Sequence, residues 1–359
     1  MRILQVISSS ATSGAERHVF SLSHLLQQQG HWVEVVCPKG GWLPQALRTA
    51  GVPVYESDMK GAGWFRTTGY VMKRIRAGRI DLVHSHLTRA TYFGAVSGAL
   101  RGVPAVASVH VGNHDQIYKR MARGRNKLIA VSNYVRGLLH GRGISDRHIE
   151  TVYNGTDFLG FEVASADEVK RELGLSPDKR VIGLIGRVCR EKGHLLLIDA
   201  MRDVARLHPD AHVLFVGRVE PLFEAEVKQA VADADLEDRI TMTGVRYDVP
   251  RLMDACEFTT MPSHQETFGV AAIEAMARSR AVVASRIGGL PEVVRHGQTG
   301  LLVDLRPDEL AHAVTYLLEH DDDRRAMGES GRAIVEQKFT LRQMAQTVEA
   351  VYRRTLETG

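Results

Sequence analysis

Two glutamates stand on either side of a short stretch that leads from a predicted strand into a predicted helix. Glu266 lies in the loop after the strand and Glu274 about one turn inside the helix, with seven residues between them. The backbone N–H groups of Phe268, Gly269 and Val270 would lie at the start of this helix, where a phosphate binds favourably. Two carboxylates beside a phosphate site suit sugar hydroxyls on one side and ribose hydroxyls on the other. Taken alone, the same residues suit a capped loop and a core phenylalanine equally well.

A second group of residues follows an earlier predicted strand that ends at Ile185. Gly186 allows the backbone to turn sharply, and Arg187 and Lys192 would supply a forked and a compact positive charge to a diphosphate. A leaving nucleoside diphosphate gains negative charge as a glycosidic bond breaks, so fixed cations would stabilise the transition state preferentially. In other enzymes a divalent metal has this role, and we expect a site that needs none.

Together the two groups resemble the signature of the retaining glycosyltransferases of family 4. Other segments similar to that family's motifs are Ser13–Glu16, Asp81–His86, Ala130–Ser132, Asn154–Asp157, Gly288–Val294 and Thr299–Val303, so the resemblance runs along essentially the whole chain. One difference is that Ser13 precedes a single Gly14, where the family often has paired glycines. The resemblance implies a GT-B fold: two Rossmann-like α/β domains face each other across a cleft, and the final helix packs back on the N-terminal domain.

The resemblance also implies roles for single residues. His110, which directly follows the predicted strand Ala105–Val109, matches the family's active-site histidine and would contact the transferred sugar and stabilise charge, although a histidine at a strand end is more often structural. Glu266 would hold the sugar hydroxyls and Glu274 the ribose. The implied catalytic residues are therefore His110 and Glu266, and the implied donor-binding residues are Gly14, Arg187, Lys192, Phe268, Gly269, Val270 and Glu274.

The expected reaction transfers a hexose from a nucleoside-diphosphate sugar, for which we expect a UDP-sugar, to a glycan, glycolipid or lipopolysaccharide-type acceptor. By resemblance, transfer retains the anomeric configuration through front-side attack assisted by a donor phosphate oxygen, with no metal or other cofactor. Two alternatives stay open: a nucleotide-sugar epimerase, which shares the two-domain architecture, and a GDP-mannose-dependent mannosyltransferase. A non-catalytic sugar-nucleotide binder is less consistent with the intact set of Arg187, Lys192, Glu266 and Glu274.

The elements that would position these residues follow from the hydrophobic pattern. Short apolar, β-branched runs alternate with segments of helical periodicity along the 359 residues, which predicts parallel sheets with helices on both faces. The pattern weakens between Asn154 and Asp178. We therefore expect one domain over residues 1–160, completed by a final helix over 340–359, and a second over 161–339. The family resemblance implies that the first binds the acceptor and the second the nucleotide sugar. Ligands bind outside the carboxyl ends of such strands, so facing domains would form a cleft for two substrates.

Composition argues against several other classes of protein. No apolar run approaches the roughly 20 residues of a membrane-spanning helix, and the chain starts on a predicted buried strand rather than a secretory signal, so we expect a cytoplasmic protein. The three cysteines are far apart and predict neither disulfides nor a zinc site. The pairs His84 with His86 and His110 with His114 lack a carboxylate at a helical ligand spacing, so we assign no metal.

A basic segment follows His110. Residues 118–127 hold five cations among ten residues, in a chain whose formal net charge is only +4. Basic and aromatic segments bind anionic lipid headgroups, which would suit peripheral contact with the inner face of a membrane and a lipid-linked acceptor. A solvated basic surface explains the segment equally well. We expect no nucleic-acid partner, because no recognised binding motif accompanies these cations.

Overall fold

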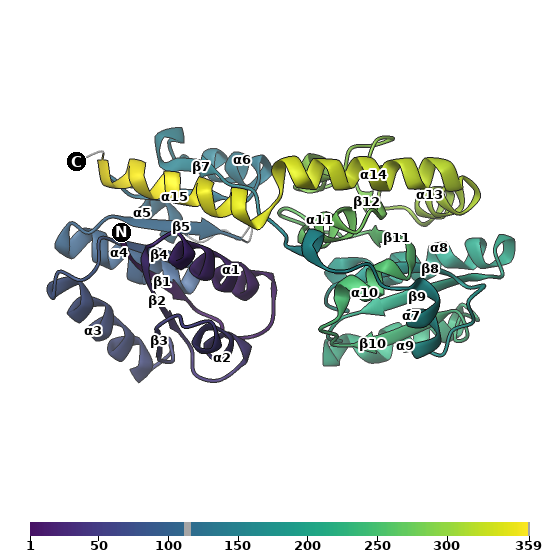
Figure 1. Cartoon of the computed structure of the whole chain (residues 1–359), viewed down its shortest axis with the longest axis horizontal. Coiled ribbons are helices and arrows are strands. Elements are labelled where there is room, and N and C mark those ends of the chain that lie inside the picture. Colours follow the sequence, from purple (N-terminus) through teal and green to yellow (C-terminus); the bar gives the residue numbers. More distant parts are fainter. Residues whose placement is uncertain (111–115, 358–359) are drawn as a thin grey trace. The chain divides into compact units, whose positions relative to one another are not determined.

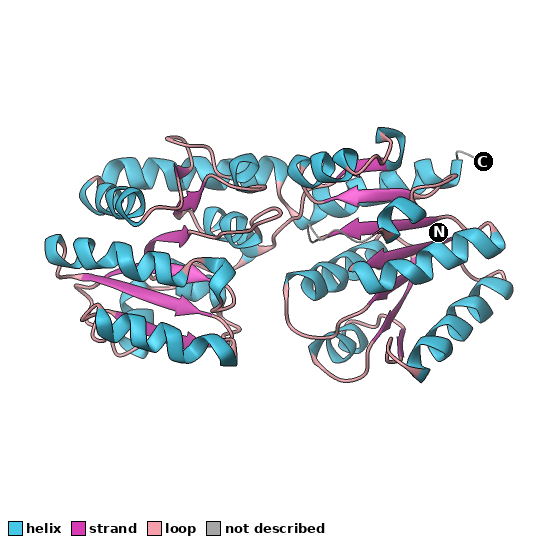
Figure 2. Cartoon of the chain, turned by 180° about the vertical axis from the view of Figure 1, so that it is seen from behind, coloured by secondary structure: helices cyan, strands magenta, loops and turns pink. Residues whose placement is uncertain are grey.

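The computed structural model describes residues 1–110 and 116–357, with the backbone alone for 97–101. It divides into two compact units: unit 1 comprises Met1–Gly155 and Leu341–Gly359, and unit 2 comprises Thr156–Thr340. The chain thus passes into unit 2 after Gly155, whereas the sequence pattern placed this boundary after residue 160. Each unit is a parallel sheet with helices on both faces (Figures 1 and 2). The predicted α/β class is therefore confirmed.

Unit 1 is built on a seven-stranded parallel sheet with the strand order β3-β2-β1-β4-β5-β6-β7. Its strands are β1 (Arg2–Ile7), β2 (Trp32–Cys37), β3 (Val54–Glu56), β4 (Leu82–His86), β5 (Ala105–Val109), β6 (Lys127–Ala130) and β7 (Ile149–Thr151). Its helices are α1 (Gly14–Gln28), α2 (Trp42–Thr49), α3 (Ala62–Arg76), α4 (Thr88–Arg101), α5 (Ile117–Met121), α6 (Asn133–Gly141), the short η1 (Asp146–His148) and α15 (Leu341–Glu357). The central strands β1, β4 and β5 are buried along most of their length because helices cover both faces.

Unit 2 repeats this plan on a six-stranded parallel sheet with the order β10-β9-β8-β11-β12-β13. Its strands are β8 (Arg180–Ile185), β9 (Ala211–Val216), β10 (Ile240–Gly244), β11 (Cys256–Met261), β12 (Ala281–Ser285) and β13 (Gly300–Val303). Its helices are α7 (Ala166–Glu172), α8 (His194–Leu207), α9 (Pro221–Asp233), α10 (Val249–Asp254), α11 (Val270–Ala277), α12 (Leu290–Val293), α13 (Pro307–Glu319) and α14 (Asp321–Lys338), with the short η2 (Phe158–Gly160) and η3 (Arg190–Lys192).

The final helix α15 belongs to unit 1 although it follows unit 2 in the chain. Its apolar face, which includes Met344, Val348 and Tyr352, packs into a core cluster with Ile3 of β1 and residues of α1 (Figure 1). The Tyr352 hydroxyl lies 2.6 Å from Nδ1 of His84 on β4. The expectation that the last helix packs back on the N-terminal domain is confirmed. No helix of the described residues has the length and apolar character needed to cross a membrane.

Both sheets reverse their strand order at one point, between β1 and β4 in unit 1 and between β8 and β11 in unit 2. Two loops diverge there at the carboxyl ends of neighbouring strands, and ligands of such sheets bind in the space between them. The predicted site residues follow β1 and β5 in unit 1 and β8 and β11 in unit 2. The topology thus explains why residues scattered along the sequence are positioned together within each unit.

Candidate active site

Two loops of unit 2 meet at the carboxyl ends of β8 and β11. The backbone N–H of His264 donates to the carbonyl oxygen of Glu191 at 2.8 Å. Gly193, with a φ of +76°, lies so close to the second loop that a Cβ would be 1.9 Å from the carbonyl oxygen of Pro262. Only glycine permits this approach. The contact fixes the position of the neighbouring Lys192.

Lys192 and Glu266 form an ion pair between these two loops. The Lys192 Nζ donates to Oε2 of Glu266 at 2.5 Å, and the side chains are 24% and 14% exposed. The backbone at Glu266 is supported by two glycines: the Gly289 N–H donates to the Glu266 carbonyl oxygen at 3.0 Å, and a Cβ at Gly288 would lie 1.9 Å from that oxygen. The glycine motif seen in the sequence therefore positions the Glu266 loop.

Arg187 lies on the same loop as Lys192 but forms an ion pair with Glu220, directly before α9. The two side chains are 49% and 38% exposed. Because an exposed ion pair is worth only about 0–1 kcal/mol, the guanidinium can exchange this partner for another anion at little cost. Glu220 was not foreseen from the sequence. Glu220 lies in the loop after β9, and β9 is the neighbour of β8 in the sheet, so a search of the loops after neighbouring strands could have found it.

The start of α11 lies between Glu266 and Glu274. Gly269 precedes the helix with a φ of +106°, and the first turn of α11 contains no acidic residue. Phe268 is 1% exposed and its ring centroid lies 5.7 Å from that of Phe339, so this side chain belongs to the core. Glu274 is half-buried in the helix. The structure thus places one glutamate before and one after a helix N-terminus, the end of a helix that favours an anion.

Gly14 begins α1, after the carboxyl end of β1. The Ser13 backbone N–H donates to Oε2 of Glu16 at 3.1 Å, and Glu16 is 1% exposed. Among the described residues, no heavy atom lies within 4 Å of where a Cβ of Gly14 would be. Packing within unit 1 therefore does not require glycine at this position.

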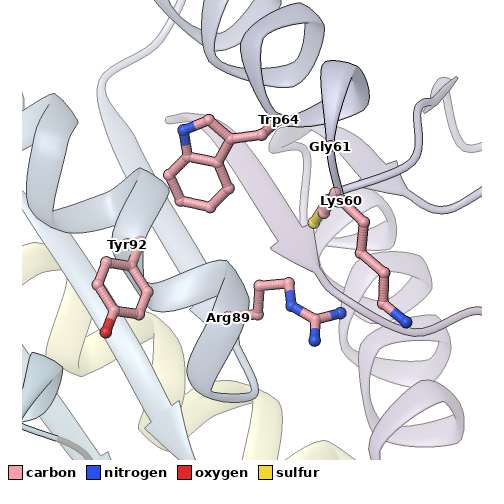
Figure 3. A pocket seen from close by; sticks show the side chains of 6 residues that line it. Lys60, Gly61, Trp64, Arg89 and Tyr92 are labelled. Carbon is pink, nitrogen blue, oxygen red and sulfur yellow. The ribbon is translucent and has the colours of Figure 1, made fainter.

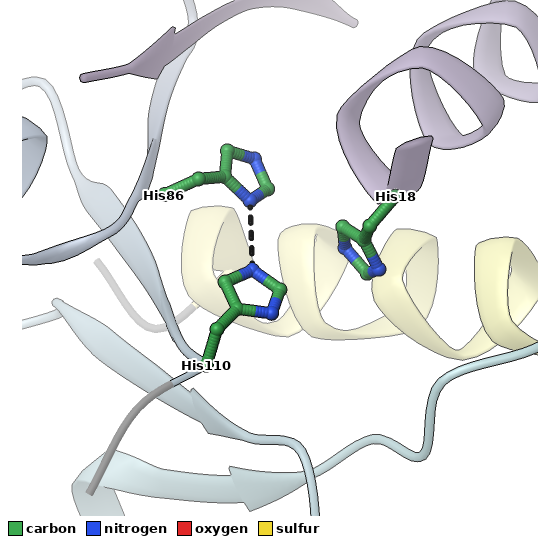
Figure 4. A group of neighbouring side chains, drawn as sticks. All are labelled: His18, His86 and His110. Carbon is green, nitrogen blue, oxygen red and sulfur yellow. Dashed lines mark hydrogen bonds between the residues drawn. The ribbon is translucent and has the colours of Figure 1, made fainter. Parts of the chain in front are cut away.

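Three histidines gather at the carboxyl edge of the unit 1 sheet (Figure 4). The ring centroid of His110, after β5, lies 4.9 Å from that of His18 on α1 and 5.7 Å from that of His86 at the end of β4. Nε2 of His86 lies 2.9 Å from Oε1 of Gln5, whose Nε2 donates to the Ser23 hydroxyl. Because a carbonyl oxygen accepts, His86 carries its proton on Nε2. The other ring nitrogen of His86, Nδ1, is therefore unprotonated. It lies 3.4 Å from Nε2 of His110.

Burial keeps this histidine cluster, defined as His18, His86 and His110, uncharged. Loss of hydration, followed by repulsion from His110, lowers the pKa of His18 to about 3. Burial and the neighbouring His84 lower the pKa of His110 to about 4. The pKa of His86 lies well below its ordinary value for the same reasons. His110 therefore offers a neutral hydrogen-bonding imidazole at physiological pH rather than a positive charge.

Within the described residues, two groups of side chains have ligand atoms within 4.8 Å of one another and could hold a metal ion: His18, His86 and His110, and Cys189, Glu191 and Glu220. Neutral imidazoles suit zinc. Burial raises the pKa of Cys189, which disfavours the thiolate that binds metals. The sequence spacing did not relate His18 to the other histidines, and His114 lies outside the described residues. That the reaction needs no metal stays a prediction.

The basic segment 118–127 is not one uniformly exposed surface. Tyr118 and Met121 are buried, at 1% and 0% exposure. Lys127 Nζ donates to the Arg147 carbonyl oxygen at 2.5 Å and lies 3.8 Å from Oε1 of Glu150. Part of the segment therefore serves the packing of unit 1, and a contact with lipid would rest on its exposed cations.

Two parallel α/β units of this topology, each with its loops diverging at a strand-order reversal, define the GT-B class of glycosyltransferases. The same fold is seen in the structure of Anabaena Alr3699/HepE in complex with UDP and glucose, which has a TM-score of 0.87, 24% identity and 98% coverage of both chains.

Comparison of the sequence identifies the family. Residues 12–158 match Glycosyltransferase Family 4, and residues 165–334 match Glycosyl transferases group 1. The alpha-maltose-1-phosphate synthase of Mycolicibacterium smegmatis is 30% identical over 76% of this chain and 79% of its own length. The D-inositol 3-phosphate glycosyltransferase of Segniliparus rotundus is 29% identical over 79% and 68%. Across four curated relatives, the matched part spans 54% to 81% of the relative's length. The chain belongs to glycosyltransferase family 4.

Proposed function

We propose that this glycosyltransferase moves a hexose from a UDP-sugar to a glycan, glycolipid or lipopolysaccharide-type acceptor, with retention of configuration and without a metal. The observation that carries the proposal is the Lys192–Glu266 ion pair, where the loops after β8 and β11 meet beside the start of α11. This arrangement combines a cation for phosphate, a carboxylate for sugar hydroxyls and a helix N-terminus in one small region.

The proposed reaction breaks the bond between the anomeric carbon and the diphosphate oxygen, and the leaving diphosphate takes the electron pair. The acceptor hydroxyl attacks from the same face and gives its proton to a donor phosphate oxygen, so configuration is retained. Lys192, with Arg187 released from Glu220, stabilises the charge that develops on the diphosphate. Glu266 accepts hydrogen bonds from the transferred sugar, and Glu274 from the ribose. Neutral His110 hydrogen-bonds the transferred sugar.

The donor proposal has support from the fold, since HepE is in complex with UDP and glucose. The acceptor proposal includes a lipid-linked substrate, with the exposed cations of 118–127 at an anionic membrane surface. A panel of UDP-, GDP- and ADP-sugars, scored by thermal stabilisation and by donor hydrolysis, separates a UDP-sugar enzyme from a GDP-mannose enzyme. Isomerisation of the donor without any acceptor would instead identify an epimerase.

Three alanine variants of one loop test the assignment of the cations. Arg187→Ala and Lys192→Ala should each lower kcat about 10²–10³-fold, as expected for losing a donor worth about 2.7–4 kcal/mol in the transition state. Arg190→Ala is the matched control, because Arg190 lies on the same loop but pairs with Glu226 on α9. Its kcat should stay near that of the native chain.

Near-native rates in Arg187→Ala and Lys192→Ala would contradict the diphosphate assignment. The same assay in excess EDTA tests the metal: activity should persist, and a loss that Mg²⁺ or Mn²⁺ restores would contradict a metal-free reaction. Far-UV circular dichroism of each variant checks that the fold is retained.

A further inference from the structure

Unit 1 contains a pocket that the donor site does not use (Figure 3). Its volume is about 460 Å³, and it is lined by Met59, Lys60, Gly61, Trp64, Arg89 and Tyr92. The loop after β3 and the first turns of α3 and α4 form its walls. Arg89 follows His86 by three residues, so the pocket lies at the same carboxyl edge of the sheet as the histidine cluster.

One wall of the pocket is aromatic. The Trp64 ring centroid lies 6.1 Å from that of Tyr92, with the ring planes at 73°, and 4.3 Å from that of the buried Phe93. Trp64 is half-buried, and Met59, at 3% exposure, adds a buried apolar side chain. Rigid, partly buried aromatic faces of this kind bind the C–H faces of a sugar ring while its hydroxyls stay free.

The other end of the pocket is cationic. Figure 3 shows the guanidinium of Arg89 and the ammonium of Lys60 pointing toward the same end. In the part of the chain that the structure describes, neither side chain forms an ion pair, whereas Arg74 of the same unit is paired with Glu34 at 2.8 Å. Two exposed cations without a counter-charge beside an aromatic wall suit a ligand that is both a sugar and an anion.

The backbone around the pocket adds to its positive potential. Helices α3 and α4 both begin there, and neither has an acidic residue in its first turn. The partial positive charge of each helix start is therefore not offset locally. Leu87, between β4 and α4, has a φ of +68° and a ψ of 154°, a strained conformation for a leucine. This turn directs the chain from the histidine cluster to Arg89.

We propose that the pocket is an acceptor subsite for a sugar that carries a phosphate or a carboxylate. The sugar ring packs on Trp64 and Tyr92, and the anionic group binds Lys60 and Arg89. This inference rests on the proposed transferase function, because it assigns the pocket to the acceptor. It also defines the acceptor's chemistry: a phosphorylated sugar or a uronic acid is bound better than its neutral counterpart.

Binding to the pocket can be measured without any transfer reaction, because Trp64 is a fluorescent reporter in its wall. The intact chain is titrated with glucose 6-phosphate, glucuronate and glucose, and Trp64→Phe establishes which part of the signal comes from the pocket. We expect at least one anionic sugar to bind with a Kd at least tenfold lower than that of glucose. Whether glucose 6-phosphate or glucuronate binds more tightly then shows whether the acceptor carries a phosphate or a carboxylate.

Arg89→Ala and Lys60→Ala should remove most of this preference for an anion. Arg66→Ala is the matched control, since it removes the same charge from an exposed position of α3 outside the pocket. All three variants should bind UDP as the native chain does, because Arg187, Lys192 and Glu274, which we propose to bind the nucleoside diphosphate, lie in unit 2. If the native chain binds an anionic sugar in this pocket but neither binds UDP nor transfers a sugar, the result counts against the proposed function and not against the pocket.

Three results would overturn the inference about the pocket. The first is equal affinity for glucose and for both anionic sugars, and the second is no saturation by either anionic sugar. The third is an Arg66→Ala variant that loses the preference as strongly as Arg89→Ala, since the effect would then come from the overall charge of the surface.

Discussion

Replacing Arg278 by alanine should destabilise unit 2 strongly. The Arg278 side chain is fully buried and donates from Nε and Nη2 to both carboxylate oxygens of Asp254, at 2.9 and 2.6 Å. It also donates to the carbonyl oxygens of Phe158, Phe161 and Glu162, at 2.9, 2.7 and 2.9 Å. One guanidinium thus anchors the first segment of unit 2 to the end of α10.

The magnitude follows from the burial of the pair. The carboxylate of Asp254 is 1% exposed, so Arg278→Ala leaves a buried charge without its counter-charge. Breaking such a pair costs about 3–5 kcal/mol. The double variant Arg278→Met/Asp254→Leu should lose less, because it removes both charges together. Arg251→Ala, which opens the exposed pair of Arg251 with Glu172, is the control and should change stability little.

Unfolding in urea can be followed separately for the two units. The three tryptophans, Trp32, Trp42 and Trp64, all lie in unit 1, so their fluorescence reports on that unit, whereas far-UV circular dichroism reports on both. With an m-value of about 2 kcal/mol/M, Arg278→Ala should lower the urea midpoint of unit 2 by roughly 2 M. A shift no larger than that of Arg251→Ala would refute the argument from burial.

Two further predictions concern the site. Glu274→Ala should weaken binding of free UDP, whereas Glu266→Ala should leave that binding nearly unchanged and slow transfer, because the two carboxylates lie after and before the start of α11. Calorimetry measures UDP binding, and single-turnover rates measure transfer. The opposite result would reverse the orientation of the donor. Unit 1 should lose stability in acid, since the folded pKa values of His18 and His110, about 3 and about 4, lie below the value of 6.5 expected for an unfolded histidine. The unfolded chain then binds more protons, so stability is complete above pH 6.5 and falls as the pH drops toward 4, by about 1.4 kcal/mol per pH unit for each histidine. Tryptophan fluorescence should follow this fall, His18→Asn should reduce its slope, and equal slopes in the two proteins would contradict the assignment of buried neutral histidines.

The alternation of strands and helices could be predicted from the sequence because it depends on local hydrophobic periodicity. The same local information placed Arg187 and Lys192 directly after one strand and Glu266 between another strand and a helix. Residue type and position relative to a strand end were therefore enough to select candidates for a diphosphate site. The loops that carry them differ little from the predicted ones, since glycines such as Gly186 and Gly269 mark the turns.

Which of these side chains contact one another was decided by the tertiary structure. Lys192 meets Glu266 across 74 positions of sequence because β8 and β11 are neighbours in the sheet, and Arg187 meets Glu220 because β9 lies on the other side of β8. Strand order depends on how the crossover helices pack, which no local pattern contains. His18 joins His86 and His110 for the same reason, since α1, β4 and β5 come together only in the folded unit.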